Sequence, residues 1–105
     1  MLESEFENIL EARINKIRET LKSKAKEYAT KDRLHNFKIA ARICDVTTEQ
    51  ALWGMASKHL VSILDMVFDS KDTTPPPPAM VDEKIGDMIN YLILLEAVFL
   101  HRIRG

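Results

Sequence analysis

Apolar residues recur at three- and four-residue steps over most of this chain, and that spacing predicts helices. In the first predicted helix, residues 3–28, the apolar positions form one narrow stripe between charged faces: Phe6, Leu10, Ile14, Ile17, Leu21, Ala25 and Tyr28. A narrow stripe is typical of a coiled-coil seam. At roughly 1.5 Å per residue the helix would be about 40 Å long. We therefore expect residues 1–30 to project or to pair with a second copy, as an oligomerisation element.

Three more helices are predicted in residues 31–105, which we expect to form the second domain. They cover about residues 32–44, residues 48–69 after the capping-box sequence Thr47-Thr48-Glu49-Gln50, and a segment from Asp82 to about Arg102. A loop at residues 70–80 contains Pro75–Pro78, which favour a stiff, extended spacer. No strand alternation occurs, so the fold class is all-α, a small bundle of about four helices with a long N-terminal helix.

The last two predicted helices each have a core-facing row. In the third helix it is Leu52, Ala56, Ile63 and Val67, with His59 among them. In the fourth helix we expect the core row to be Ile85, Met88, Ile89, Leu92, Phe99 and Ile103. A second row of the fourth helix is polar and then apolar: Glu83, Asp87, Asn90, Leu94 and Val98. Its polar half predicts the margin between an open cleft and the core, where polar groups need partners.

Composition limits the function classes. The 105 residues fit one compact domain with a net charge of −1. A single cysteine, Cys44, excludes a disulfide framework, favours a reducing compartment and is most simply a small core residue. The acidic N-terminus has no secretion signal, and the longest apolar run, residues 91–100, is interrupted by Glu96 and is too short to span a membrane. We expect a cytoplasmic protein without membrane contact.

Basic residues are concentrated in the middle of the chain. Residues 13–42 contain ten basic and three acidic side chains, a local charge of +7. This indicates an anionic ligand or an acidic partner, although a solvated helix surface explains it equally simply. The segment Lys31–Lys38 combines cations, an amide and an aromatic ring, which suits phosphate and base contacts as well as an ordinary amphipathic helix start. Duplex nucleic acid is disfavoured by the near-zero net charge.

Carboxylates form a second candidate site. If the third and fourth helices are antiparallel, Asp65 and Asp69 approach Glu83 and Asp87, and four carboxylates on facing helices can hold Mg²⁺. Capping, exposed charge and salt bridges with neighbouring lysines are the simpler explanation. His59 alone is most simply a hydrogen-bonded core histidine. Gly-rich phosphate loops, Cys/His zinc spacing and a Gly-x-Ser-x-Gly sequence are all missing.

Several short motifs resemble the small phage-associated family called nucleotide modification associated domain. The resemblance covers about residues 31–97 and rests on Asp32-Arg33, Asn36-Phe37-Lys38, Ala51-Leu52-Trp53-Gly54-Met55, Lys58-His59, Ser62-Ile63, Asp65, Glu83-Lys84-Ile85-Gly86-Asp87 and Asn90-Tyr91-Leu92. The segment Glu83–Asp87 is also similar to the metal-binding helix of MazG-like all-α nucleotide pyrophosphohydrolases. The enzymes' motif has a glutamate three residues before its aspartate, and here that position is Lys84. An ammonium group repels Mg²⁺ but attracts phosphate.

These resemblances imply a nucleotide-binding protein without catalysis, one that could sequester a host signalling nucleotide, cyclic or linear, in a phage-infected cell. The expected ligand residues are Arg33, Asn36, Lys38, Lys58, His59, Lys84, Asp87, Asn90 and Tyr91. No cofactor is expected on this hypothesis. The alternatives are a divergent pyrophosphohydrolase that binds Mg²⁺ through Asp65, Asp69, Glu83 and Asp87, and a helical module that binds another protein.

Overall fold

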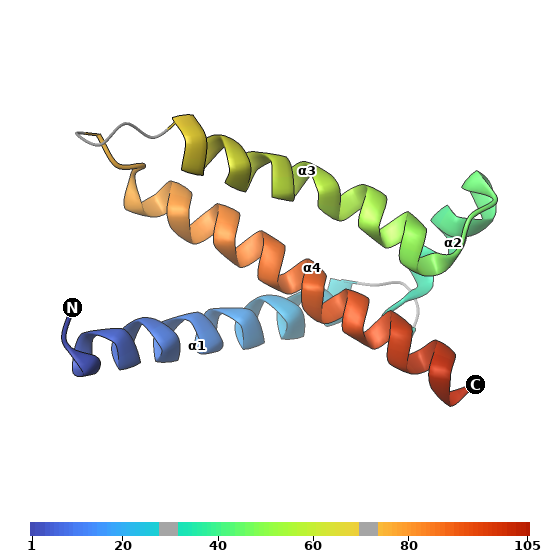
Figure 1. Cartoon of the computed structure of the whole chain (residues 1–105). Helices are drawn as coiled ribbons and strands as arrows, with labels where there is room; N and C mark the ends of the chain where they lie inside the picture. Colours follow the sequence, from blue (N-terminus) through green and yellow to red (C-terminus); the bar gives the residue numbers. More distant parts are fainter. Residues whose placement is uncertain (28–31, 70–73) are drawn as a thin grey trace. The chain divides into compact units, whose positions relative to one another are not determined.

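The computed structural model describes residues 1–27, 32–69 and 74–105, and in these ranges the chain is helical without strands (Figure 1). The helices are α1 (Glu3–Glu27), α2 (His35–Cys44), α3 (Thr48–Asp69) and α4 (Pro78–Arg104). The predicted all-α class and long N-terminal helix are therefore confirmed. No described helix has an apolar stretch that could cross a membrane.

The chain divides into two compact units, Met1–Arg33 and Leu34–Gly105. The first unit contains α1, where the apolar side chains Phe6, Ile9 and Leu10 are about half-exposed. Below the described end of α1, the Arg33 guanidinium donates a hydrogen bond to the Leu21 carbonyl oxygen at 3.0 Å. Tyr28 and Lys31, which the sequence placed in α1 and in the basic segment, lie outside the described residues.

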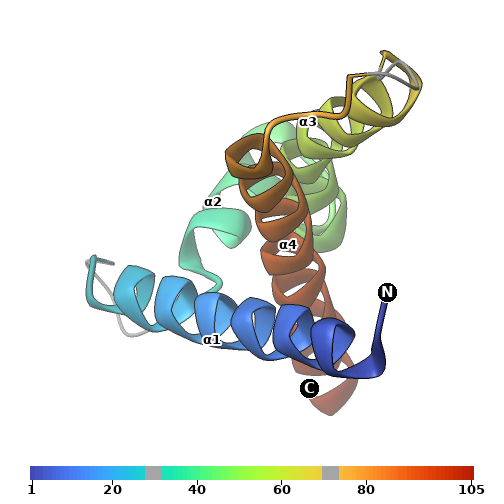
Figure 2. The ribbon, with the colours of Figure 1, turned by 90° about the vertical axis from the view of Figure 1, so that its left-hand side faces the viewer.

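In the second unit, α4 runs alongside α3 and α2 packs against α3 (Figures 1 and 2). The core lies where the three helices meet and consists of Leu34, Phe37, Leu52, Ala56 and Val98. Leu52 is completely buried. Met55, Tyr91, Leu94 and Leu95 pack around this core. All later arguments about the site refer to this unit.

The start of α3 has the predicted capping box. The Gln50 backbone N–H donates to the Thr47 hydroxyl at 3.2 Å, and the Thr47 backbone N–H donates to the Gln50 side-chain oxygen at 3.0 Å. This reciprocal pair satisfies amides that have no partner inside the helix. The box follows directly after α2, which ends with Asp45 in the left-handed region (φ 54°).

The start of α4 differs from the prediction. The helix begins at Pro78, one turn before Asp82 and Glu83. Proline is favoured at the first helical position because the N–H that it lacks would have no partner there. Pro77 has φ −60° and ψ 144°, the extended polyproline geometry expected for the segment before the helix. The other end extends to Arg104, two residues beyond the prediction.

The predicted core row of α4 is wrong over its C-terminal half. Val98, from the second row, is 2% exposed, whereas Ile103, from the expected core row, is 78% exposed. Leu92 and Phe99 are also about half-exposed, and only Met88 of the expected row is buried. Because α4 is apolar on several sides, its periodicity does not decide which side packs against α3. The row that does pack also contains Asp87 and Asn90.

Cys44 is exposed, which contradicts its expected place in the core. Ala41, one turn earlier on the same side of α2, is buried. Cys44 is the last residue of α2, and the left-handed Asp45 that follows turns the chain into α3. The apolar spacing continues to Cys44, but the helix packing ends before it.

Candidate functional site

Three of the predicted ligand residues meet between α3 and α4. The His59 ring on α3 lies 4.9 Å from the Tyr91 ring on α4, measured between centroids, with the rings tilted by 31°. The His59 Nδ1 atom is 3.6 Å from the Asp87 carboxylate. His59 is mostly buried, with 18% of its side chain exposed, and Asp87 is 41% exposed. We call His59, Asp87 and Tyr91 the seam cluster.

The seam cluster combines an aromatic surface with a polar edge. Tilted ring pairs at this distance are attractive, and a carboxylate beside one imidazole nitrogen fixes the orientation of the ring. Because Asp87 and Tyr91 are four residues apart, they lie on one face of α4, and that face turns toward His59. The arrangement differs from an isolated core histidine, because an ionisable side chain that is partly open to solvent accompanies the ring.

Asn90 adds a buried acceptor next to this cluster. Its Oδ1 atom is inaccessible and has no hydrogen-bond partner among the described residues. A buried polar atom without a partner costs free energy. Such an atom in a natural fold calls for an explanation, and a ligand that supplies a donor is one.

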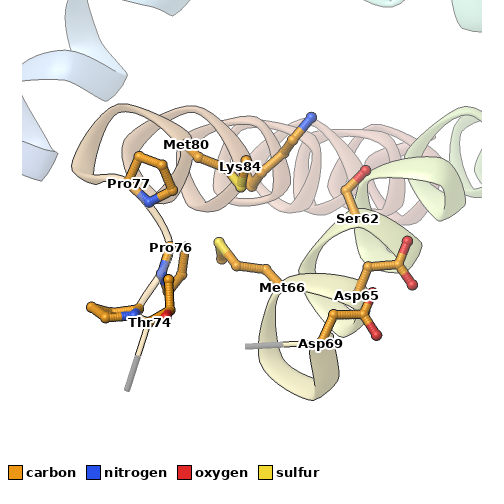
Figure 3. Close-up of a pocket in the computed structure, with 10 residues that line it drawn as sticks. Ser62, Asp65, Met66, Asp69, Thr74, Pro76, Pro77, Met80 and Lys84 are labelled. Carbon is orange, nitrogen blue, oxygen red and sulfur yellow. The ribbon is translucent and has the colours of Figure 1, made fainter. Parts of the chain in front are cut away.

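A pocket of about 420 Å³ opens between α3, the proline segment and the start of α4 (Figure 3). Met66, Met80 and the prolines 75–77 supply apolar walls, and Ser62 and Lys84 supply polar groups. In Figure 3, Met66 extends from α3 toward Pro76, while the carboxylates of Asp65 and Asp69 point to the opposite side of α3. The pocket is therefore apolar inside and charged at its rim.

Lys84 connects the pocket with the seam cluster. It lines the pocket and lies three residues before Asp87, on the same side of α4. Its ammonium nitrogen is 3.7 Å from the carboxylate of the neighbouring Glu83. Pairs of this kind near the surface are weak, so the ammonium group can exchange this partner for a phosphate.

The remaining predicted ligand residues are dispersed. Lys58 is exposed on α3 and Asn36 is exposed on α2, and neither lines the pocket. Arg33 belongs to the first unit. Lys38 lines another hollow, at the other end of α3. The structure thus assembles His59, Asp87, Asn90, Tyr91 and Lys84 along α3 and α4, and does not add the other four.

The four carboxylates of the alternative magnesium site have different surroundings. Asp65 and Asp69 lie at the rim of the pocket, Asp87 faces His59, and Glu83 faces Lys84. Within residues 1–27, 32–69 and 74–105, no three His, Cys, Asp or Glu side chains are close enough together to hold a metal ion. The antiparallel pairing expected from the sequence is present, but it does not bring the four carboxylates to one point.

The second hollow, about 520 Å³, lies between α2, the α2–α3 turn and the ends of α3 and α4. Arg102 from α4 forms an ion pair and hydrogen bond with Glu49 on α3, 53 residues away in the sequence. A hydrogen bond from the backbone N–H of Glu49 holds the pKa of its carboxyl below the usual 4.5, and Arg102 lowers the pKa further. Sequence analysis did not single out Glu49 or Arg102 as site residues, because no local motif connects them.

Comparison of the chain with protein-family models, curated proteins and solved structures found no match.

Proposed function

We propose that this protein binds a nucleotide between α3 and α4 and holds it without hydrolysis. The observation that carries the proposal is the position of Lys84, a cation at the rim of an apolar pocket and next to the seam cluster. A nucleotide has the matching chemistry, a flat apolar ring joined to an anion. A volume of about 420 Å³ is within the usual range for small-molecule sites.

The apolar walls suit a base. Thioether sulfur atoms make favourable contacts with aromatic rings, and Met66 and Met80 both line the pocket. Lys84 would contact the phosphate as a point charge. The seam cluster would contact ribose or a second base: Tyr91 and His59 offer ring surface, and Asn90 offers an acceptor that now has no partner.

Lys84 also supports binding without catalysis. An ammonium group at the pocket repels a divalent ion and attracts phosphate directly. The resemblance to pyrophosphohydrolases makes this residue the decisive departure, since their motif has a carboxylate there. In the cytoplasm of a phage-infected bacterium, a protein that holds a nucleotide intact would sequester a signal of host defence, and a cyclic nucleotide is the form we expect.

Thermal unfolding of the full chain with mono-, di- and cyclic nucleotides, with and without Mg²⁺, tests this function. A nucleotide at 100 times its Kd should stabilise the protein by about 2.7 kcal/mol. Lys84→Gln should weaken binding about tenfold, because one charged hydrogen bond contributes about 1.5 kcal/mol. Arg104→Gln, the matched control, removes a cation from the far end of the same helix and should change Kd less than twofold. Equal losses in both variants would contradict the proposed pocket.

A magnesium-dependent pyrophosphohydrolase is the second candidate, and one observation favours it. Asp65 and Asp69, one turn apart on α3, both border the pocket. This hypothesis predicts conversion of a nucleoside triphosphate to monophosphate and pyrophosphate, abolished by Asp87→Asn and by EDTA. Chromatography of the nucleotide after incubation distinguishes it from the binding protein, which returns the nucleotide unchanged.

The half-exposed apolar stripe of α1 supports the proposal that copies of the chain associate through this helix. Exposed apolar stripes of this size favour association with another helix. Phe6→Glu with Leu10→Glu should convert an oligomer to a monomer in size-exclusion chromatography with light scattering. A pull-down that recovers a different protein on the same stripe, with no nucleotide effect on stability, would instead favour the interaction module.

A further inference from the structure

We propose that the hollow between α2, α3 and the end of α4 is a second anion-binding site, which takes a phosphate or pyrophosphate group through Lys38, Arg42 and Arg102. The hollow has a volume of about 520 Å³. All of its walls belong to the second unit. The inference does not depend on the proposed nucleotide site.

The cations come from two helices that are distant in sequence. Lys38 and Arg42 are four residues apart and therefore lie on one face of α2. Arg102 reaches the same hollow from the last turn of α4. Two carboxylates, Asp45 and Glu49, also line it, so three positive charges oppose two negative charges.

One of the two carboxylates is already neutralised. Glu49 forms an ion pair with Arg102. A guanidinium group has five N–H donors in a planar fork, so Arg102 can hold Glu49 and still donate to an anion. The ion pair thereby fixes the direction of the Arg102 side chain toward the hollow.

Arg42 provides the cation that the fold leaves available. It is exposed and forms no ion pair with any residue in the described ranges. Guanidinium groups bind phosphate through two parallel hydrogen bonds. The first-turn amides of α3 are partly occupied by the capping box, so the side-chain cations, and not the helix terminus, are the basis of this site.

The site is separate from the pocket that Lys84 lines. Glu49 and Asp65 are 16 residues apart on α3, which corresponds to about 24 Å at roughly 1.5 Å per residue. A phosphate held by Lys84 therefore cannot also contact Arg42. Two phosphate-binding regions at opposite ends of one helix can be examined with different variants.

The experiment is a titration of the full chain with inorganic phosphate and with pyrophosphate, followed by calorimetry and by amide NMR. We expect pyrophosphate to shift the amide signals of Arg42, Asp45 and Glu49. Arg42→Gln should raise the Kd for pyrophosphate at these signals about tenfold, and Arg42→Lys should raise it less, because lysine keeps the charge but lacks the fork. Arg104→Gln, with the same loss of charge, should change Kd less than twofold.

Lys84→Gln is the control that separates the two sites. It should leave the Kd read at Arg42, Asp45 and Glu49 unchanged, whatever its effect on nucleotides. The inference is overturned if these amides do not respond to millimolar pyrophosphate. It is also overturned if Arg42→Gln and Arg104→Gln weaken binding equally, which would indicate attraction to net charge alone.

Discussion

Replacement of Val98 by alanine tests which face of α4 packs against α3. Val98 is 2% exposed and belongs to the core with Leu52 and Ala56. Asp87, Tyr91 and Leu94 lie on the same face of α4, at steps of four, three and four residues. If Val98 is buried as described, the seam cluster is positioned by the same packing.

The expected magnitude follows from the buried carbons. Valine to alanine removes two, at about 0.8 kcal/mol each, and the cavity that remains adds to this, so the loss of stability should be about 2 kcal/mol. Ile103→Ala removes three carbons from a side chain that is 78% exposed, and should cost about 0.5 kcal/mol. Leu92→Ala, at 46% exposure, should cost about 1.3 kcal/mol. The variant that loses the fewest carbons should therefore be the least stable.

Urea unfolding followed by fluorescence measures these differences. The single tryptophan, Trp53, lies on α3 and reports on the unit that contains the seam cluster. The urea midpoint should fall in proportion to the cost while the slope m stays constant. If Ile103→Ala or Leu92→Ala costs more than Val98→Ala, the opposite row of α4 is buried, and the seam cluster would have to be abandoned.

Three further outcomes follow from local features. Thr47→Ala should lower the stability by about 1 kcal/mol in urea unfolding, because it removes the hydroxyl that accepts from the Gln50 N–H; an unchanged midpoint would contradict the capping box. Gly54→Ala should raise stability by about 1 kcal/mol, because no atom lies within 4 Å of the added methyl group and alanine is the better helix former; a loss of stability would show a close neighbour. The lowered pKa of Glu49 means that its ionised form stabilises the fold, a contribution present above the usual value of 4.5 and lost as pH falls through the lowered pKa. The difference in Tm between the natural chain and Glu49→Gln should therefore be visible at neutral pH and vanish in acid, and a difference that grows in acid would reverse this assignment.

Local signals predicted α3 well. The capping box at Thr47 and Gln50 defines the first turn through contacts between residues three apart, and the helix begins at Thr48 as expected. The start of α4 was placed one turn too late, because Asp82 and Glu83 were taken as the first turn. Pro78 was the better signal, since proline favours the first helical position.

The packing face of α4 could not be decided in the same way. Rows through Leu92 and through Val98 are both apolar, and the sequence period is satisfied by either. Only the contact with α2 and α3, which depends on residues far apart in the chain, selects the row of Val98. The exposure of Cys44 has a similar origin, because the end of helix packing, and not the apolar spacing, determines it.

The candidate site was predicted in part. The motifs around His59 and Asp87–Tyr91 singled out residues that the structure brings together across two helices. The same motifs added Lys38 to that group, although it lies in the hollow with Arg102. Residue type indicates affinity for phosphate, but the position of each cation depends on which helices meet, and Arg102 meets α2 and α3 only in the folded chain.

Amide NMR of the full chain during titration with the nucleotide panel tests the central claim most directly. We predict that the nucleotide that binds most tightly shifts the amide signals of Ser62, Lys84, Asp87 and Tyr91, and that it is recovered unchanged afterwards. Shifts confined to other parts of the chain, no shift with any nucleotide at millimolar concentration, or recovery of a cleaved nucleotide would contradict a binding protein with its site between α3 and α4.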